Sequence, residues 1–225
     1  MDFLSAKKQG SVLIVELKRP KEGNALNRRL QKELAQTWEE LEDTDDLLVG
    51  VVHGGPTVFS IGHDREELLH GQGEAASPIP EDGMFPLNLR KPVIAAIEGP
   101  CYGLGFELAL SCDLRVAGEG SLLGMPDHNL FVPYRMASVL LPRMTFAGLG
   151  LQMLLAGRTL NAEEARQRRL VNQVAAGGQA LATATAAATA MARKFGSADA
   201  FKKRLIWRLS AEPAPEAQAM VREPA

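Results

Sequence analysis

Residues 99–116, GPCYGLGFELALSCDLRV, constrain the fold more than any other part of the sequence. A strand, a turn with Gly103 and Gly105, and a short apolar helix follow one another, and glycine permits close approach of two backbones. The first N–H groups of a helix have no partner within it, so they could hold a developing oxyanion. Glu107, one turn further along, could then exchange protons there, or it could simply lie at the solvent edge.

Apolar strands alternate with helices in the first part of the chain, which predicts an α/β fold with a largely parallel sheet. Residues 48–53 and 93–97 are nearly continuous apolar runs, typical of strands covered on both faces. A strand is expected at residues 11–18, and a helix capped by Asn27 should follow it as far as about residue 43. Beyond Pro133 the pattern is mostly helical.

The length of 225 residues fits one large domain with a small appendage. We expect a core domain over residues 1–195, and a short C-terminal helix with a disordered tail over residues 196–225. Further strands are expected at residues 113–117, 121–124 and 170–174, and further helices at residues 65–70, 134–146, 147–155, 162–168 and 201–209, the last preceded by an Ala/Thr-rich helix.

Charge and composition exclude several classes of partner. The net charge of −2 gives no electrostatic reason to expect nucleic acid or an anionic membrane. No apolar run reaches the length of a membrane span, and the first ten residues do not resemble a signal peptide. Cys101 and Cys112 lie in apolar surroundings, which predicts buried thiols in a reducing compartment and therefore a cytoplasmic protein. No residue spacing suggests a metal site.

Five motifs follow one another along the chain. They are KRPKEGNALN (residues 18–27), FSIGHD (59–64), KPVIAAIEGPCYGLGFELALSCDLRVA (91–117), LGMPD (123–127) and LAGRTLNAEEARQRRLVNQV (155–174). In this order they resemble the motifs of the enoyl-CoA hydratase/isomerase family, the crotonase superfamily. The resemblance implies a crotonase-like spiral of ββα units with a helical C-terminal part, assembled as a homotrimer or a dimer of trimers. It also implies an acyl-CoA thioester as the ligand, with coenzyme A entering as part of the substrate and not as a separate cofactor.

The resemblance also implies the roles of particular residues. The backbone N–H groups of His63 and Leu104 would form the oxyanion hole that holds the thioester oxygen. Glu107 and Asp127 would be the two catalytic carboxylates, although a hydratase of the family normally carries Glu at the second position. Because Asp is one methylene shorter, Asp127 could reach its target only through a water molecule, or it could merely cap the following turn.

Coenzyme A would bind between the first of these motifs and the second. The resemblance implicates the backbone around Ala25 and Leu26 in the first motif, and around Ile61 and Asp64 in the second. Lys21 is a candidate contact for a phosphate group, although a single surface lysine is more often only solvated.

Two departures from the family pattern bear on the acyl pocket. Residues 133–138, PYRMAS, contain no glycine where hydratases have a glycine-rich turn, so Tyr134, Arg135 and Met136 should narrow the acyl pocket. Because some isomerase-like members of the family also lack these glycines, this departure favours an isomerase over a hydratase. Typical members also continue for another helix or two, so the C-terminal part looks truncated and the pocket would be more open or covered by a neighbouring subunit.

Three functions remain open from the sequence. The leading hypothesis is an enoyl-CoA hydratase that adds water across a 2-enoyl-CoA double bond. The second is an enoyl-CoA isomerase or another crotonase reaction, such as thioester hydrolysis or decarboxylation. The third, of a different class, is a non-catalytic acyl-CoA-binding or assembly subunit.

Overall fold

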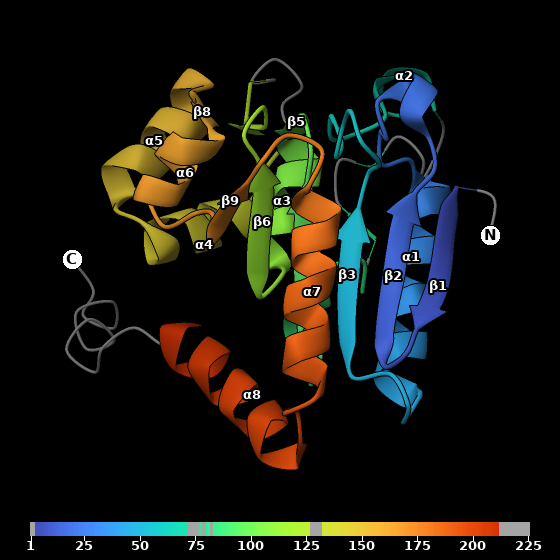
Figure 1. Cartoon of the computed structure of the whole chain (residues 1–225). Helices are drawn as coiled ribbons and strands as arrows, with labels where there is room; N and C mark the ends of the chain where they lie inside the picture. Colours follow the sequence, from blue (N-terminus) through green and yellow to red (C-terminus); the bar gives the residue numbers. More distant parts are fainter. Residues whose placement is uncertain (1–2, 72–76, 78–79, 82, 127–131, 212–225) are drawn as a thin grey trace, which may run out of the picture.

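The fold is organised around a six-stranded sheet with strand order β1-β2-β3-β4-β6-β9 (Figure 1). The computed structural model describes residues 3–71, 77, 80–81, 83–126 and 132–211. The strands of the sheet are β1 (Leu4–Gln9), β2 (Val12–Leu17), β3 (Val49–His53), β4 (Val93–Ile97), β6 (Leu114–Gly118) and β9 (Gln173–Ala175). Every pairing is parallel except the β1–β2 hairpin, which confirms the expected largely parallel sheet.

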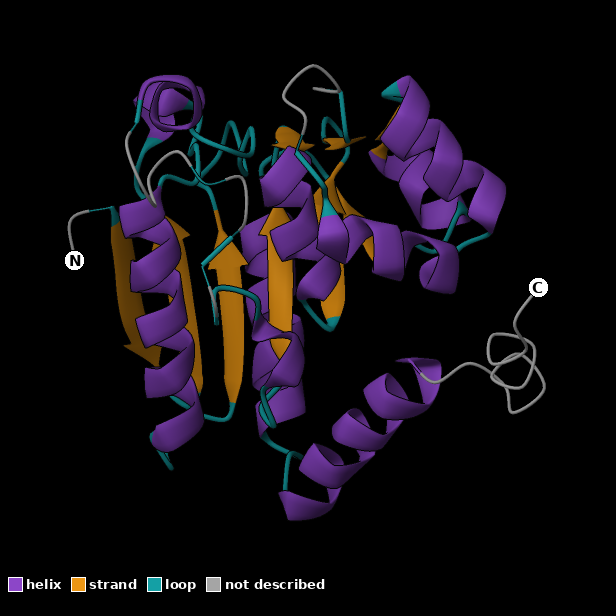
Figure 2. Cartoon of the chain, turned by 180° about the vertical axis from the view of Figure 1, so that it is seen from behind, coloured by secondary structure: helices purple, strands orange, loops and turns teal. Residues whose placement is uncertain are grey.

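Helices cover both faces of this sheet (Figures 1 and 2). Helix α7 (Ala180–Ala192) packs on one face through small side chains, and α1 (Arg28–Asp43) and α3 (Gly103–Ser111) lie on the other. All residues of β3 and β4 are buried, as their apolar sequences predict. The core is therefore two apolar layers separated by the sheet.

Helix α1 begins where the sequence predicts. The side chain of Asn27 accepts a hydrogen bond from the N–H of Leu30 at 2.9 Å, so an otherwise unpaired donor of the first turn is satisfied. Trp38 is buried on the inner face of this helix, and its indole N–H donates to the carbonyl of Met84 at 2.8 Å. This hydrogen bond holds the segment that leads towards β4 against α1.

A second sheet joins the core to a group of helices. Its strands are β5 (Pro100–Tyr102), β7 (Leu122–Gly124) and β8 (Thr159–Asn161), and the helices are α4 (Arg135–Met144), α5 (Ala147–Ala156) and α6 (Ala162–Gln167). The predicted cap of α6 is present, because Asn161 and Glu164 bond each other's backbone N–H groups. Strands β1 and β8 were not predicted, and the strand expected at residues 170–174 begins only at Gln173.

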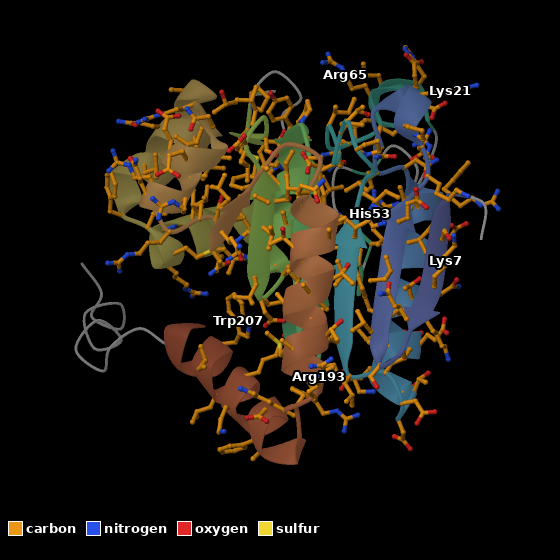
Figure 3. All side chains as sticks on the ribbon, viewed as in Figure 1. Lys7, Lys21, His53, Arg65, Arg193 and Trp207 are labelled. Carbon is orange, nitrogen blue, oxygen red and sulfur yellow. The ribbon has the colours of Figure 1, made fainter. Side chains whose placement is uncertain are left out.

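Helix α8 (Ser197–Ala211) lies at the opposite end of the molecule from the second sheet (Figures 1 and 3). Trp207 donates to Asp113 at 2.9 Å and Lys203 forms an ion pair with the same carboxylate at 2.8 Å, which ties α8 to the start of β6.

The tail predicted after α8 lies outside the described residues. No helix in the described ranges has the length and apolar character needed to cross a bilayer. The remaining short helices are α2 (Arg65–His70), η1 (Pro20–Glu22) and η3 (Pro86–Asn88).

Candidate active site

Two glycine-containing segments meet at the start of α3. A Cβ atom on Gly105 would lie 2.5 Å from the Cβ of Ser60, and one on Gly62 would lie 3.1 Å from the backbone nitrogen of Leu104. Gly62 also has φ +101°, a conformation that side chains disfavour. The N–H of Tyr102 donates to the carbonyl of Ser60 at 2.8 Å and holds the two segments together. Only glycine at these positions allows such close backbone contact.

This contact brings together the segments that carry the two predicted oxyanion donors. His63 directly follows Gly62, and Leu104 is the second residue of α3, where a backbone N–H has no acceptor within the helix. Both residues are buried, and His63 also bridges to Leu26. The assignment of these two N–H groups as the oxyanion hole stays a prediction, now with both donors on touching segments.

Glu107 is not at the solvent edge, and the alternative that placed it there is wrong. It follows Gly103 by four residues on α3, so it lies one helical turn from the start of the helix, and it is 1% exposed. Its carboxylate accepts hydrogen bonds from the N–H groups of Met136 and Ala137, the latter at 2.9 Å. Glu107 therefore caps the first turn of α4, whose own N-cap residue, Tyr134, makes no side-chain cap bond.

Burial and capping act on the Glu107 carboxyl in opposite directions. Burial raises its pKa to about 7, and the two N–H bonds from α4 oppose that rise because they favour the ionised form. A carboxyl group with this pKa is present in both protonation states near neutral pH. It can therefore accept and donate protons there, as a general acid or base must.

The raised pKa of Glu107 predicts a pH-dependent stability. The folded chain binds this proton more tightly than the unfolded chain, whose carboxyl titrates near 4.5. The free energy of unfolding should therefore fall between pH 4.5 and pH 7, by an amount on the order of 3 kcal/mol, and change no further from this group above that range. Urea unfolding of the native chain and of Glu107→Gln across this pH range measures the difference. A difference that is constant with pH would contradict the prediction.

Tyr134 lies directly against the start of α3. Its hydroxyl oxygen is 3.5 Å from the position that a Cβ on Gly103 would take, and its ring centre is 6.2 Å from that of His63. The side chain is 7% exposed. The prediction that this residue fills space left open by glycine elsewhere in the family is consistent with this placement.

The two segments implicated in binding coenzyme A also lie side by side. The N–H of Leu26 donates to the carbonyl of Gly62 at 2.7 Å, and the N–H of Ile61 donates to the carbonyl of Gly23 at 2.9 Å. Ala25 and Leu26 are buried, whereas the side chain of Ile61 is 40% exposed. Their backbones thus form one continuous surface, with Ile61 at its apolar, accessible edge.

The other two candidate contacts for coenzyme A, Asp64 and Lys21, lie in different surroundings. Asp64 pairs with Arg19 at 2.8 Å and accepts the N–H of Glu67 as the cap of α2, so its carboxylate positions the loop. Arg19, which no sequence pattern singled out, also donates to the carbonyl of Ala25 at 2.6 Å and so braces both segments. Lys21 is exposed at the same end of the molecule as Arg65 (Figure 3). A phosphate contact by Lys21 stays a prediction.

The second predicted carboxylate, Asp127, lies outside the described residues. Among the described residues, no three His, Cys, Asp or Glu side chains are grouped so that they could hold a metal ion. The described part of the site therefore consists of one buried carboxyl group, two touching backbone segments and the ring of Tyr134.

Comparison with known proteins identifies the family. A family model described as enoyl-CoA hydratase/isomerase matches residues 7–221. This chain belongs to the enoyl-CoA hydratase/isomerase (crotonase) family. The carnitinyl-CoA dehydratase of Escherichia coli K12 is 30% identical to it over 226 aligned positions, which cover 98% of this chain and 86% of that protein.

Solved structures agree with this chain in fold. The structure of DspI from Pseudomonas aeruginosa superposes with a TM-score of 0.88 at 28% identity, covering 98% of this chain and 88% of the other. An enoyl-CoA hydratase from Mycobacterium tuberculosis superposes with a TM-score of 0.83, also at 28% identity, over 98% and 93% of the two chains. The expected α/β crotonase-like fold is thereby confirmed, and the chain is a crotonase-family enzyme that acts on acyl-CoA thioesters.

Proposed function

We propose that this enzyme is an enoyl-CoA hydratase. The observation that carries the proposal is the buried Glu107 carboxyl, whose pKa is about 7, one helical turn from the contact between the two predicted oxyanion segments. A 2-enoyl thioester becomes electrophilic at its β-carbon when negative charge on the thioester oxygen is stabilised. The arrangement would supply that stabilisation and a proton acceptor on the same helix.

In the proposed reaction, the Glu107 carboxylate takes a proton from a water molecule while the water oxygen bonds to the β-carbon. The electron pair of the double bond moves to the thioester oxygen, where the N–H groups of His63 and Leu104 hold the enolate. Each such donor is worth roughly 3 kcal/mol of transition-state stabilisation. Asp127 delivers a proton to the α-carbon, and proton exchange with solvent restores both carboxyl groups. The sum is addition of one water.

The direct test is incubation of the purified enzyme with crotonyl-CoA. Loss of the absorbance of the conjugated enoyl thioester, with formation of 3-hydroxybutanoyl-CoA, is the expected result. Release of unacylated coenzyme A would instead identify thioester hydrolysis. Binding of the thioester without any turnover would identify a non-catalytic acyl-CoA-binding subunit.

A second candidate function, enoyl-CoA isomerase, is favoured by the turn at Tyr134. The ring of Tyr134 lies against Gly103 at the start of α3, so it takes up space that a water molecule reacting near the predicted oxyanion donors would need. An isomerase needs no water, because one carboxyl group moves a proton between two carbons of the acyl chain. Incubation with 3-hexenoyl-CoA separates the two functions, since an isomerase would convert it to the 2-enoyl thioester without a hydroxyacyl product.

We also propose that the enzyme assembles as a homotrimer or a dimer of trimers. Helix α8 supports this, because Leu205 and Ile206 are 42% and 64% exposed. Light scattering should give three or six times the chain mass of 24.3 kDa. Ile206→Glu should lower the measured mass, because a charge at an apolar interface is costly, and Lys8→Glu on exposed β1 should not. A monomeric native chain would contradict the proposal.

The proposed compartment is the cytoplasm. Cys101 and Cys112 are both buried, as predicted from their apolar surroundings, and they form no disulfide. Free thiols are typical of proteins in a reducing compartment, which supports the proposal. Burial raises the pKa of the Cys112 thiol to about 12, so this group is an unreactive thiol and not a nucleophile.

A further inference from the structure

Tyr134 is held in an unusual backbone conformation. It has φ +38° and ψ +53°, in the left-handed region that bulky residues rarely adopt, at the N-cap of α4. Such a conformation costs free energy and persists only where the surroundings impose it. Here it directs the ring into the interior, where the side chain is only 7% exposed.

The ring of Tyr134 lies between two parts of the molecule. Its hydroxyl end lies against Gly103, 3.5 Å from the place of a Cβ atom there, and so lies beside the predicted oxyanion segments. The same residue forms part of the wall of a cavity of about 440 Å³ between α4 and α5. Tyr134 is thus shared between the candidate active site and this cavity.

The cavity suits an alkyl chain. Apart from Tyr134 and Ser138, its walls are apolar, with Pro133, Pro142, Leu151 and Leu154 among them. Its volume falls in the range of about 300–1,000 Å³ that is usual for small-molecule sites. An acyl chain that extends from a thioester held at Gly103 towards α4 would meet the ring of Tyr134 before it reached this space.

We propose that Tyr134 determines the acyl-chain length of the substrate. Its ring closes the cavity between α4 and α5 to the thioester, so the native enzyme takes short acyl groups such as butanoyl. Removal of the ring joins the cavity to the active site as a pocket for longer chains. This inference rests on the proposed function, since it assumes an acyl-CoA thioester whose carbonyl lies at the start of α3.

The test is calorimetric binding of butanoyl-CoA and octanoyl-CoA, saturated thioesters that are not hydrated. Each methylene that is transferred from water into an apolar pocket strengthens binding about fourfold. Tyr134→Gly should therefore raise the ratio of octanoyl-CoA affinity to butanoyl-CoA affinity at least about tenfold over that of the native chain. Glycine also accepts the positive φ of this position, so the variant relieves a strained backbone.

Two further variants test whether the gain in octanoyl-CoA affinity comes from the cavity between α4 and α5. Tyr134→Phe keeps the ring and should show no gain for octanoyl-CoA. The double variant Tyr134→Gly with Ser138→Phe places a new ring at the cavity wall and should lose the gain. Circular dichroism and thermal unfolding confirm that each variant is folded.

The outcomes separate the inference from the proposed function. An unchanged ratio of octanoyl-CoA to butanoyl-CoA affinity in folded Tyr134→Gly overturns the inference, and so does a gain that survives in the double variant. Failure of the native chain to hydrate crotonyl-CoA, with the selectivity change present, overturns the hydratase proposal and leaves Tyr134 as the determinant of chain length.

Discussion

Glu107→Gln should lower kcat for hydration of crotonyl-CoA by at least about a hundredfold, the scale of a lost general acid or base. The amide cannot accept the proton of the attacking water. Its oxygen can still accept the N–H groups of Met136 and Ala137, so α4 should keep its position. Steady-state kinetics of the purified variant, with KM measured separately from kcat, test this expectation.

The pH dependence gives an independent readout of the same group. Native kcat should rise with pH through a transition near 7, because the carboxylate form of Glu107 is the one that accepts a proton from water. That transition should be absent in the residual activity of Glu107→Gln. Full turnover by the variant would show that another group is the base.

Gly105→Ala should destabilise the fold and impair the site together. Within a helix, this substitution ordinarily gains about 1 kcal/mol. Here the new Cβ would lie 2.5 Å from the Cβ and 2.9 Å from the carbonyl oxygen of Ser60, so the loop must move away from α3. Overpacking of this kind costs about 1–3 kcal/mol. The predicted donors of His63 and Leu104 would separate, and a shift of about 1 Å can cost a hundredfold in rate.

A matched control is Gly120→Ala, where nothing lies within 4 Å of the new Cβ. Its free energy of unfolding should stay within about 0.5 kcal/mol of the native value, and its activity should not change. Urea unfolding and the crotonyl-CoA assay on both variants make the comparison. Equal stability and activity of the two variants would mean that α3 does not depend on the backbone contact with Ser60.

The regular elements of the core could be predicted from the sequence because their signals are local. The apolar runs of β3 and β4 specify strands that are buried on both faces, and Asn27 specifies the start of α1 within a few residues. Strand β8 consists of Thr159, Leu160 and Asn161, which form neither an apolar run nor a recognisable alternation. It forms because the segment before α6 is brought beside β7.

For the site, the sequence by itself determined the family, because the order of the motifs along the chain does not depend on how the chain packs. It also determined which residues are candidates, including Glu107 and the segments of His63 and Leu104. It could not determine the state of Glu107, because a carboxylate on a short helix is compatible with solvent or with the interior. Only the tertiary structure decided this, since the N–H groups of Met136 and Ala137 come from α4, and Ala137 lies 30 residues beyond Glu107 in the sequence. Burial and long-range hydrogen bonds set the pKa of a group, and neither is encoded in its immediate neighbours.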